Sequence, residues 1–307
     1  MTSAPLLSAG LRRRLEDDGV DADDVAAVIR RALDEDITDR GDVTSLACIE
    51  ETQCSAASFV ARGSGCLAGM HVVAAVIETV CGANEIELEV LVDDGGILEA
   101  GTIIARVEAS TRSLLVVERT ALNLLCHLSG IASTTAQWVR AVAGTGAVIR
   151  DTRKTTPGLR ALEKYAVRCG GGMNHRMNLS DAVLVKDNHI AAAGGVVATF
   201  SLVRAHVDDL SIEIEVDNLD QLDTAIEAGA DLVLLDNFSV DDLRRAVETG
   251  RRHLSTTGRP VLFEASGGLT LATVRAVADT GVQFLAVGNL THSSPILDIG
   301  LDFLDPH

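Results

Sequence analysis

The sequence predicts an α/β protein in which a nearly closed, incomplete barrel of parallel strands follows a smaller α+β region. From residue 147 onward, short apolar runs alternate with helical stretches, an order that produces a parallel sheet with right-handed crossovers. Six runs are present, fewer than the eight strands of a closed barrel, and no glycine-rich dinucleotide fingerprint follows the first run. Between residues 53 and 109, shorter apolar runs broken by glycine predict strands and turns.

Helical periodicity dominates the rest of the N-terminal half. In residues 23–36, apolar side chains recur at spacings of three and four, with acidic residues at the start, which predicts an amphipathic helix. Residues 113–128 show the same spacing and predict another helix. Residues 1–20 and the connection at 249–260 carry no recognisable pattern, so we interpret them as extensions of the fold.

The second half supplies the six expected strands of the barrel. Their apolar runs and polar stops occupy 147–154, 182–188, 212–218, 231–237, 261–268 and 284–289. Two of the intervening stretches, 219–229 and 270–281, have helical spacing and end in glycine, the usual residue just beyond a helix.

Composition and charge exclude several classes of protein. The chain has 307 residues, 47% of them apolar, and a formal net charge of −18, which argues against nucleic acids and anionic membranes as partners. No uninterrupted apolar run approaches the roughly 18 residues of a membrane span, and the N-terminus lacks the order of a secretory signal. The six cysteines of the chain show no CxxC spacing, which predicts reduced thiols in a cytoplasmic protein.

Polar residues follow each apolar run, and in a parallel barrel these ends meet at the carboxyl rim, where ligands bind. A polar stop alone would explain one or two such residues, but not a ring ordered by charge. Along the chain, the ring contains Arg153, Lys154, Lys186, Glu215, Asp236, Glu264, Ser266, Gly267, Gly268, Gly288 and Asn289. Cations therefore follow the early strands, carboxylates the middle strands, and small residues the last two.

Residues 150–176 concentrate positive charge, with seven Lys or Arg against two acids, and all three lysines of the chain lie in or just after this segment. Arg153 and Lys154 before its helix, and His175 and Arg176 after it, can converge on one pocket. Guanidinium forks match carboxylate geometry, so such a pocket predicts a ligand with more than one carboxylate or phosphate. The pattern leaves open whether His175 is neutral or protonated.

The helix in this segment is expected to begin at a Thr cap with Pro157 in its first turn. Arg160, Lys164 and Arg168 recur every four residues along it. For these three cations we predict a solvent-exposed helix face rather than contact with a ligand.

The carboxylates suit a cation or hydroxyl groups. Glu215 and Asp236 end adjacent runs and fit a Mg²⁺ shell or the hydroxyls of a ligand beside developing positive charge. Glu213 shares the strand face of Glu215, and we expect it in a structural ion pair below the site. The glycine-rich ends of the last two strands predict a phosphate cradle of backbone N–H groups, although such a sequence is also an ordinary turn.

These segments resemble the quinolinate phosphoribosyltransferase family. The resemblance is carried by "RDTRKTTPGLRALEKYAVRCGGGMNHRMNLSDAVLVKDNHI" at 150–190, by 212–237, and by "EASGG" and "VGNLTHSSPILDIGLDF"; "DEDITDRGDVTS", "GCLAGM" and "VERTALNLLCHLSGIAS" in the N-terminal half agree. It implies transfer of phosphoribosyl from phosphoribosyl pyrophosphate to quinolinate with decarboxylation, giving nicotinate mononucleotide, pyrophosphate and CO₂ in NAD biosynthesis, with Mg²⁺.

The resemblance also implies a fold and an assembly. It implies an open TIM-like α/β barrel with an N-terminal α/β sandwich domain, divided as 1–128 for the sandwich, 129–291 for the barrel and 292–307 for a C-terminal segment that returns to the sandwich. The enzyme would be a cytoplasmic homodimer or a higher oligomer of dimers, without nucleic acid or membrane partners. Arg119 would then reach the active site of the neighbouring subunit.

The resemblance assigns roles to the charged ring. Arg119, Arg153, His175 and Arg176, with Lys186 nearby, would hold the two quinolinate carboxylates. Lys154 and Lys186 would face the pyrophosphate, and Glu215 and Asp236 would serve the ribose hydroxyls and the Mg²⁺ shell through water. Together with the two lysines, these acids form the expected catalytic set. The remaining residues would bind the 5′-phosphate: Ser266, Gly267, Gly268, Gly288 and Asn289.

Three other functions remain open at this point. A Schiff-base aldolase with Lys154 or Lys186 as nucleophile would explain the lysines but not the arginines around them. A related phosphoribosyltransferase could act on a pyridine monocarboxylate. An anion-binding sensor could keep the fold without turnover, although the set of Glu215, Asp236 and the lysines argues against it.

Overall fold

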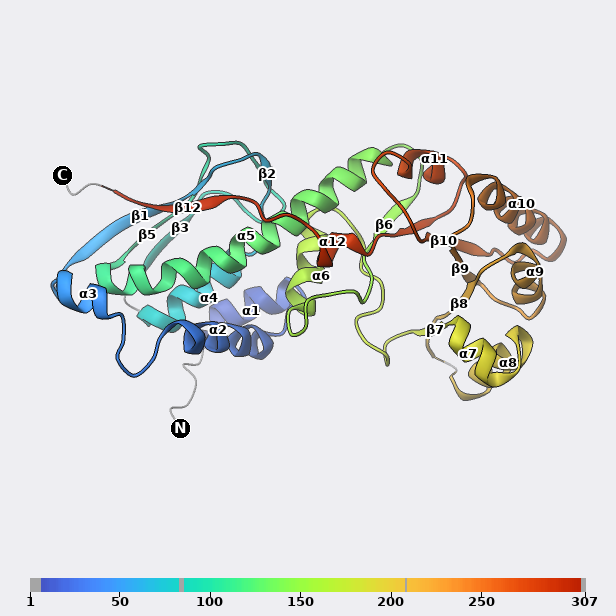
Figure 1. The fold of residues 1–307 in the computed structure, drawn as a ribbon, viewed down its shortest axis with the longest axis horizontal. Coiled ribbons are helices and arrows are strands. Elements are labelled where there is room, and N and C mark those ends of the chain that lie inside the picture. The colour runs from blue at the N-terminus through green and yellow to red at the C-terminus, as the bar shows by residue number, and fades with distance from the viewer. Residues whose placement is uncertain (1–6, 83–85, 208, 305–307) are drawn as a thin grey trace. The chain divides into compact units, whose positions relative to one another are not determined.

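A computed structural model describes residues 7–82, 86–207 and 209–304, which form two compact units (Figure 1). The first unit contains the described residues up to Ala136, Thr155–Gly171 and the chain from Leu290 onward. The second contains Gln137–Lys154 and Gly172–Asn289. Residues 155–171 thus group with the first unit, although the chain on both sides of them belongs to the second.

The first unit is built on an antiparallel sheet. Its strand order is β12 (Ile299–Phe303), β1 (Cys54–Ala61), β5 (Ile103–Ser110) and β3 (Glu87–Val90), and the short strands β2 (Gly65–Cys66) and β4 (Ile97–Leu98) pair separately. The C-terminal strand lies beside β1, with Phe59 opposite Leu301. Phe59 is fully buried and Leu301 nearly so, which explains why the end of the chain joins this sheet.

Helices pack with this sheet to form an α/β sandwich (Figure 1). They are α1 (Ala9–Asp17), α2 (Ala22–Asp36), α3 (Val43–Cys48), α4 (Met70–Cys81), α6 (Arg160–Cys169) and α5 (Thr111–Ala141) as far as residue 136. The helix predicted at 23–36 is confirmed as α2. The interpretation of residues 1–20 as an extension is wrong for α1, because Leu11 and Leu15 are each only 1% exposed and belong to the core. Residues 1–6 lie outside the described residues.

Helix α5 is the only described helix long and apolar enough to cross a membrane, with a mean hydropathy of 1.3 in its most apolar window. The sequence had suggested no candidate, because polar residues interrupt the apolar ones. In the protein, 61% of that window is buried. The apolar side chains of α5 therefore contribute to the core.

The second unit contains a six-stranded parallel sheet, which confirms the predicted barrel strands. The order is β6 (Val148–Arg150), β11 (Phe284–Ala286), β10 (Leu262–Ser266), β9 (Leu232–Asp236), β8 (Ile212–Val216) and β7 (Val183–Val185). This is the circular order of a (β/α) barrel, interrupted between β6 and β7, so the barrel is open. Helices follow the strands: α7 (Asp187–Ala193), α8 (Val196–His206), α9 (Leu219–Glu227), α10 (Val240–Thr257) and α11 (Val274–Ala278). Helix α12 (Asn289–His292) comes after β11 and belongs, from Leu290 onward, to the first unit.

Two local expectations require correction. Helix α6 begins after Leu159, and Pro157 lies in the preceding turn, where Gly158 has a φ of +83° that no helix accommodates. Part of the segment at 249–260, interpreted as an extension, is the last part of α10, which continues to Thr257 and ends at Gly258 in a left-handed conformation.

Candidate functional site

The register of the barrel strands brings the predicted polar residues to one rim. Residues paired across parallel strands point to the same face of the sheet. The observed pairs on the inner face are Glu215 with Leu234, Leu234 with Glu264, Asp236 with Ser266, Ser266 with Ala286, and Ala286 with Arg150. Five strands thus contribute side chains to the same face at the carboxyl end of the sheet, as predicted for a ligand site.

A cavity of about 440 Å³ lies at this rim, within the second unit. Its lining includes eight of the predicted site residues, namely Arg153, Lys154, His175, Arg176, Lys186, Glu215, Asp236 and Ser266. Sequence reasoning missed Thr152, Leu184, Leu234 and Ala286, and it named Glu264 without giving it a role. The alternation of side chains along a strand could have identified the three apolar residues, Leu184, Leu234 and Ala286. Each lies in a barrel strand between neighbours that point to the opposite face of the sheet.

The other predicted residues lie outside this lining. Gly267 and Gly268 follow β10, while Gly288 and Asn289 follow β11, the neighbouring strand, so the two loops begin side by side. Arg119 is an exposed residue of α5 and belongs to the first unit.

Two arginines, Arg153 and Arg176, make the cavity a favourable site for an anion. Burial, and next the neighbouring charge of Arg153, lower the pKa of Arg176. The Arg153 Nε atom is buried and has no hydrogen-bond partner among the described residues. Two like charges close together, one with an unsatisfied buried donor, are unfavourable without a ligand. A carboxylate or phosphate supplies both the missing acceptor and the counter-charge.

Both cavity lysines are exposed to solvent. Lys186 Nζ lies 2.6 Å from Glu215 Oε2, and its side chain is 47% exposed. Lys154 is exposed. A Schiff-base nucleophile needs an uncharged amine, which burial away from carboxylates would favour. Lys186 pairs with a carboxylate and both lysines are exposed, so neither has that environment, and the site argues against the aldolase alternative.

The end of β9 is held by Asn237, whose φ of +56° places a non-glycine residue in the left-handed region. Its Nδ2 donates to Asp236 Oδ2 over 2.7 Å, and its backbone N–H donates to Ser266 O over 2.8 Å. A Cβ atom on Gly267 would lie 2.1 Å from Asn237 Oδ1. Asn237 therefore orients the Asp236 carboxylate, and this packing leaves room only for glycine at 267.

Asp151, fully buried at the end of β6, fixes the loop that carries His175 and Arg176. Its Oδ1 accepts the His175 backbone N–H over 2.8 Å, and its Oδ2 accepts Asn174 Nδ2 over 2.6 Å. The segments before and after α6 are thereby joined at the rim. The Asp151 carboxylate therefore holds the His175–Arg176 segment close to the Arg153–Lys154 segment, as expected for two cationic segments that converge on one pocket.

At the wall of the cavity, His175 and Glu264 form a cluster with Glu213 and the partly buried Arg150. Arg150 Nη1 donates to Glu264 Oε2 over 2.5 Å, and its guanidinium carbon lies 4.8 Å from the centre of the Phe284 ring. His175 Nε2 lies 2.9 Å from Glu213 Oε2 and 3.6 Å from Glu264 Oε1. The inward orientation predicted for Glu213 is confirmed. Burial, and next the neighbouring charge of Glu213, raise the pKa of Glu264 to about 7, although the charge of Arg150 opposes this.

Replacing Glu264 with glutamine should reduce the pH dependence of stability. Because folding raises the pKa of Glu264 from 4.5 to about 7, the folded protein binds more protons than the unfolded chain in this window. Stability of the natural protein therefore falls as pH rises through it, whereas glutamine does not titrate. Relative to the natural protein, the variant should gain on the order of 2–3 kcal/mol between the two ends of this window.

Thermal unfolding midpoints of both proteins, measured at half-unit pH steps, test this expectation. The gap between the midpoints should shift by several degrees in favour of the variant as pH rises. A constant gap across the window would show that Glu264 titrates normally.

The prediction for Lys164 is wrong. Arg160 and Arg168 are partly exposed, but Lys164 is fully buried, as are its neighbours from Leu162 to Val167. Helix α6 packs closely against α5, and a Cβ atom on Gly170 would lie 2.4 Å from the Ala132 carbonyl oxygen. A four-residue spacing of cations defined a helix face correctly but not whether another element covers it.

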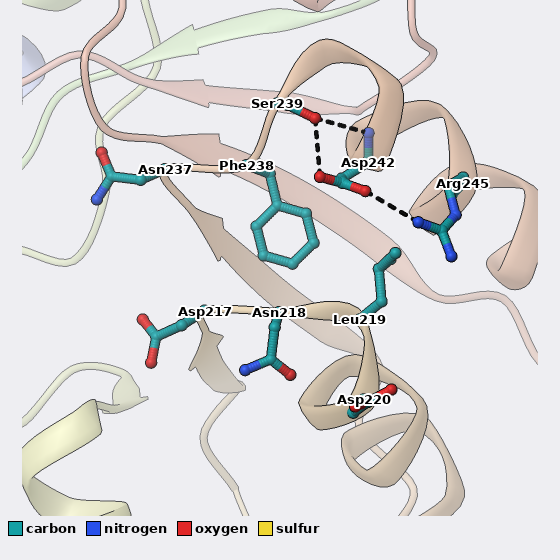
Figure 2. Close-up of a pocket in the computed structure, with 9 residues that line it drawn as sticks. All are labelled: Asp217, Asn218, Leu219, Asp220, Asn237, Phe238, Ser239, Asp242 and Arg245. Carbon is teal, nitrogen blue, oxygen red and sulfur yellow. Dashed lines mark hydrogen bonds and ion pairs between the residues drawn. The ribbon is translucent and has the colours of Figure 1, made fainter.

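A second cavity, of about 330 Å³, lies beyond the ends of β8 and β9 between the starts of α9 and α10 (Figure 2). Figure 2 shows Ser239 capping α10 through the Asp242 backbone N–H, and Asp242 paired with Arg245. The rest of its charged lining is Asp217 and Asp220. Excess negative charge and a paired arginine make this cavity unsuitable for a polyanion, so the first cavity is the candidate active site.

Comparison with known families agrees with this architecture. The model described as "Quinolinate phosphoribosyl transferase, C-terminal domain" matches residues 131–302. The model described as "Quinolinate phosphoribosyl transferase, N-terminal domain" matches residues 42–129. Together the two models cover most of the chain.

Individual relatives agree with the matches to the family models. The chain is 49% identical over 260 residues to a nicotinate-nucleotide pyrophosphorylase [carboxylating] of Mycobacterium leprae, covering 85% of this chain and 90% of that protein. It is 41% identical over 250 residues to a probable enzyme of the same name from Synechocystis, covering 81% and 82%. The solved nicotinate-nucleotide pyrophosphorylase of Francisella tularensis superimposes with a TM-score of 0.86 and 37% identity, covering 92% and 96%.

Proposed function

Because this chain belongs to the quinolinate phosphoribosyltransferase family, we propose that its barrel cavity binds quinolinate and phosphoribosyl pyrophosphate and joins them with loss of CO₂. The products would be nicotinate mononucleotide, pyrophosphate and CO₂. The chain is thus a phosphoribosyltransferase of NAD biosynthesis. One observation carries the assignment of the cavity, namely the close pair Arg153 and Arg176 with an unsatisfied buried Nε.

Positioning and charge supply most of the proposed catalysis. Arg153 and Arg176 hold the carboxylates of quinolinate, with Lys186 beside them, and orient the pyridine nitrogen toward C1 of the ribose. That nitrogen forms the new bond as the bond from C1 to the pyrophosphate oxygen breaks, and Lys154 and Lys186 stabilise the departing anion. Glu215 and Asp236 face the ribose, where positive charge develops. The 5′-phosphate is assigned to Ser266, Gly267, Gly268, Gly288 and Asn289.

Decarboxylation follows from the charge that the first step creates. The pyridine nitrogen becomes cationic when it bonds to C1, and the C2 carboxylate lies next to it. The C2–carboxylate bond breaks, its electron pair stays at C2 beside the positive nitrogen, and C2 then takes a proton from water. No covalent intermediate with a protein nucleophile is required.

The acidic residues at the rim fit a Mg²⁺ ion. Glu215 and Asp236 each keep one carboxylate oxygen beyond those bound by Lys186 and Asn237, and hard oxygen ligands are those Mg²⁺ prefers. The two residues would hold the ion through water. When bound, Mg²⁺ supplies positive charge that stabilises the pyrophosphate leaving group.

The assembly is the remaining part of the proposal. We assign the protein to the cytoplasm as a homodimer, or a higher oligomer of dimers, in which Arg119 completes the active site of the neighbouring subunit. The exposure of Arg119 on α5 supports this, since a cation there is available to a partner.

Steady-state product detection tests the proposal. The purified protein is mixed with quinolinate, phosphoribosyl pyrophosphate and Mg²⁺, and nicotinate mononucleotide, pyrophosphate and released CO₂ are quantified. We expect equal amounts of the three products, and almost none after Mg²⁺ is chelated. Turnover of nicotinate without CO₂ would assign the protein to a monocarboxylate. Binding of both substrates without product would favour an anion sensor.

A further inference from the structure

The cluster at the wall of the cavity has a hydrogen-bonding pattern that the proposed reaction does not explain. Glu264 and Glu213 are 0% and 3% exposed, and they flank one nitrogen of His175. Two carboxylates this close and this buried are costly unless each has a defined partner. Arg150 binds Glu264, which leaves Glu213 as the nearer carboxylate to His175.

The other ring nitrogen determines the state of His175. The Arg176 backbone N–H donates to His175 Nδ1 over 2.6 Å, so this nitrogen holds a lone pair and no proton. The ring proton therefore belongs on Nε2, where the nearest acceptors are Glu213 and Glu264 at 2.9 and 3.6 Å. Nε2 is fully buried, and its contacts with the two carboxylates are ion-pair distances that do not meet the angular criteria of a hydrogen bond.

The same pattern argues against a metal ion in this cluster. One ligand atom from each of His175, Glu213 and Glu264 lies within 4.8 Å of the others, a spacing compatible with metal binding. A metal would require the lone pair of Nε2, while Nδ1 already uses its lone pair to accept the Arg176 N–H. Such a ring would carry no proton at either nitrogen, an unfavourable imidazolate. The cluster is better described as a support for the cavity.

We propose that Glu213 is a positioning residue that holds His175 in its Nε2–H tautomer, so that Nδ1 fixes the backbone of Arg176 and aims its guanidinium at the carboxylates of the substrate. This rests on the proposed function, and it changes the role of His175 from a direct ligand of quinolinate to a support for Arg176. The Arg176 side chain is also fixed from its other end, because Nη1 donates to the Ala182 carbonyl over 3.1 Å.

Arg150 and Glu264 determine which carboxylate the His175 ring faces. With its Oε2 bound to Arg150, Glu264 presents Oε1 to the imidazole from a longer distance than Glu213 does. The ring is therefore directed to one acceptor, and its orientation is defined. Since Arg150 belongs to β6, Glu213 to β8 and Glu264 to β10, three barrel strands together set one active-site loop.

The first test is spectroscopic. Two-bond ¹H–¹⁵N spectra of the protein with labelled histidine distinguish a protonated ring nitrogen from one with a lone pair, and the His175 signals are assigned by their loss in His175→Asn. We expect Nε2 to be protonated and Nδ1 to be bare. A proton on Nδ1, or on both nitrogens, in the natural protein would overturn the proposal.

The second test uses two substitutions at the same position. Glu213→Gln keeps an oxygen acceptor and loses the charge, whereas Glu213→Leu loses both. We expect the Kd for quinolinate, measured by calorimetry, to rise about tenfold or more in Glu213→Leu and only about threefold in Glu213→Gln. The Kd for phosphoribosyl pyrophosphate should change less than about twofold in both. Equal effects of the two substitutions, or no effect of Glu213→Leu, would overturn the proposal.

The chain offers a matched control. His127 Nε2 lies 2.9 Å from Glu163 Oε1 in the first unit, and Glu163 is fully buried, so Glu163→Gln makes the same chemical change elsewhere. It should alter neither the His175 signals nor the Kd for quinolinate. If the natural protein bound no quinolinate, the proposed function would fail. If it bound quinolinate as tightly with leucine at 213, only the role of Glu213 would fail.

Discussion

Replacing Arg153 with alanine should lower kcat/KM for quinolinate by about 30- to 1,000-fold, which corresponds to a loss of roughly 2–4 kcal/mol in transition-state stabilisation. The guanidinium lines the cavity, and its buried Nε has no acceptor among the described residues, so the substrate is expected to provide one. Its charge is also close enough to lower the pKa of Arg176. Alanine removes both a charged donor and one of the positive charges that attract the substrate dianion.

Two further substitutions separate the causes of this loss. Arg153→Lys keeps the charge without the planar fork and should recover only part of the activity, because an ammonium cannot bind a carboxylate in the same two-donor geometry. Arg244→Ala removes an arginine of the same unit whose side chain is 58% exposed and pairs with Asp241, and it should change kcat/KM less than about twofold. Near-normal kcat/KM in Arg153→Ala would place the quinolinate site elsewhere.

The barrel could be predicted because each strand is a short apolar run with a polar stop. The six stops were also sufficient to place Lys186, Glu215, Asp236 and Ser266 on one rim, since the carboxyl ends of parallel strands meet there. This inference depends only on strand direction and parity. The roles of these residues remain predictions.

Features that depend on contacts between distant segments could not be predicted. Helix α5 was expected to end near residue 128, but it continues through Gly130, where a Cβ atom would lie 2.1 Å from the Pro295 carbonyl oxygen. That glycine permits close packing and does not end the helix. The pairing of Arg150 with Glu264 likewise requires the register across β6, β11 and β10, and the state of His175 requires the conformation of its loop.

Mixing two inactive variants should restore activity if Arg119 acts across subunits. Arg119→Ala and Arg153→Ala are each expected to be strongly impaired, because each lacks one charged donor at every site. In a mixed dimer, the Arg119→Ala subunit keeps its own Arg153 and receives Arg119 from the other subunit, so one of the two sites is complete. After random exchange at equal amounts, half of the dimers are mixed, and about a quarter of all sites should be active.

The control is a mixture of Arg153→Ala with Arg176→Ala. Both residues line the cavity from the second unit of one chain, so exchange of subunits cannot assemble a complete site. This mixture should stay inactive although mixed dimers form, which differently tagged subunits verify by affinity purification. If the Arg119→Ala mixture also stayed inactive while mixed dimers were recovered, Arg119 would serve its own chain or no site at all. Recovery in the first mixture alone requires that the two arginines of one active site come from different chains, because neither variant contains both.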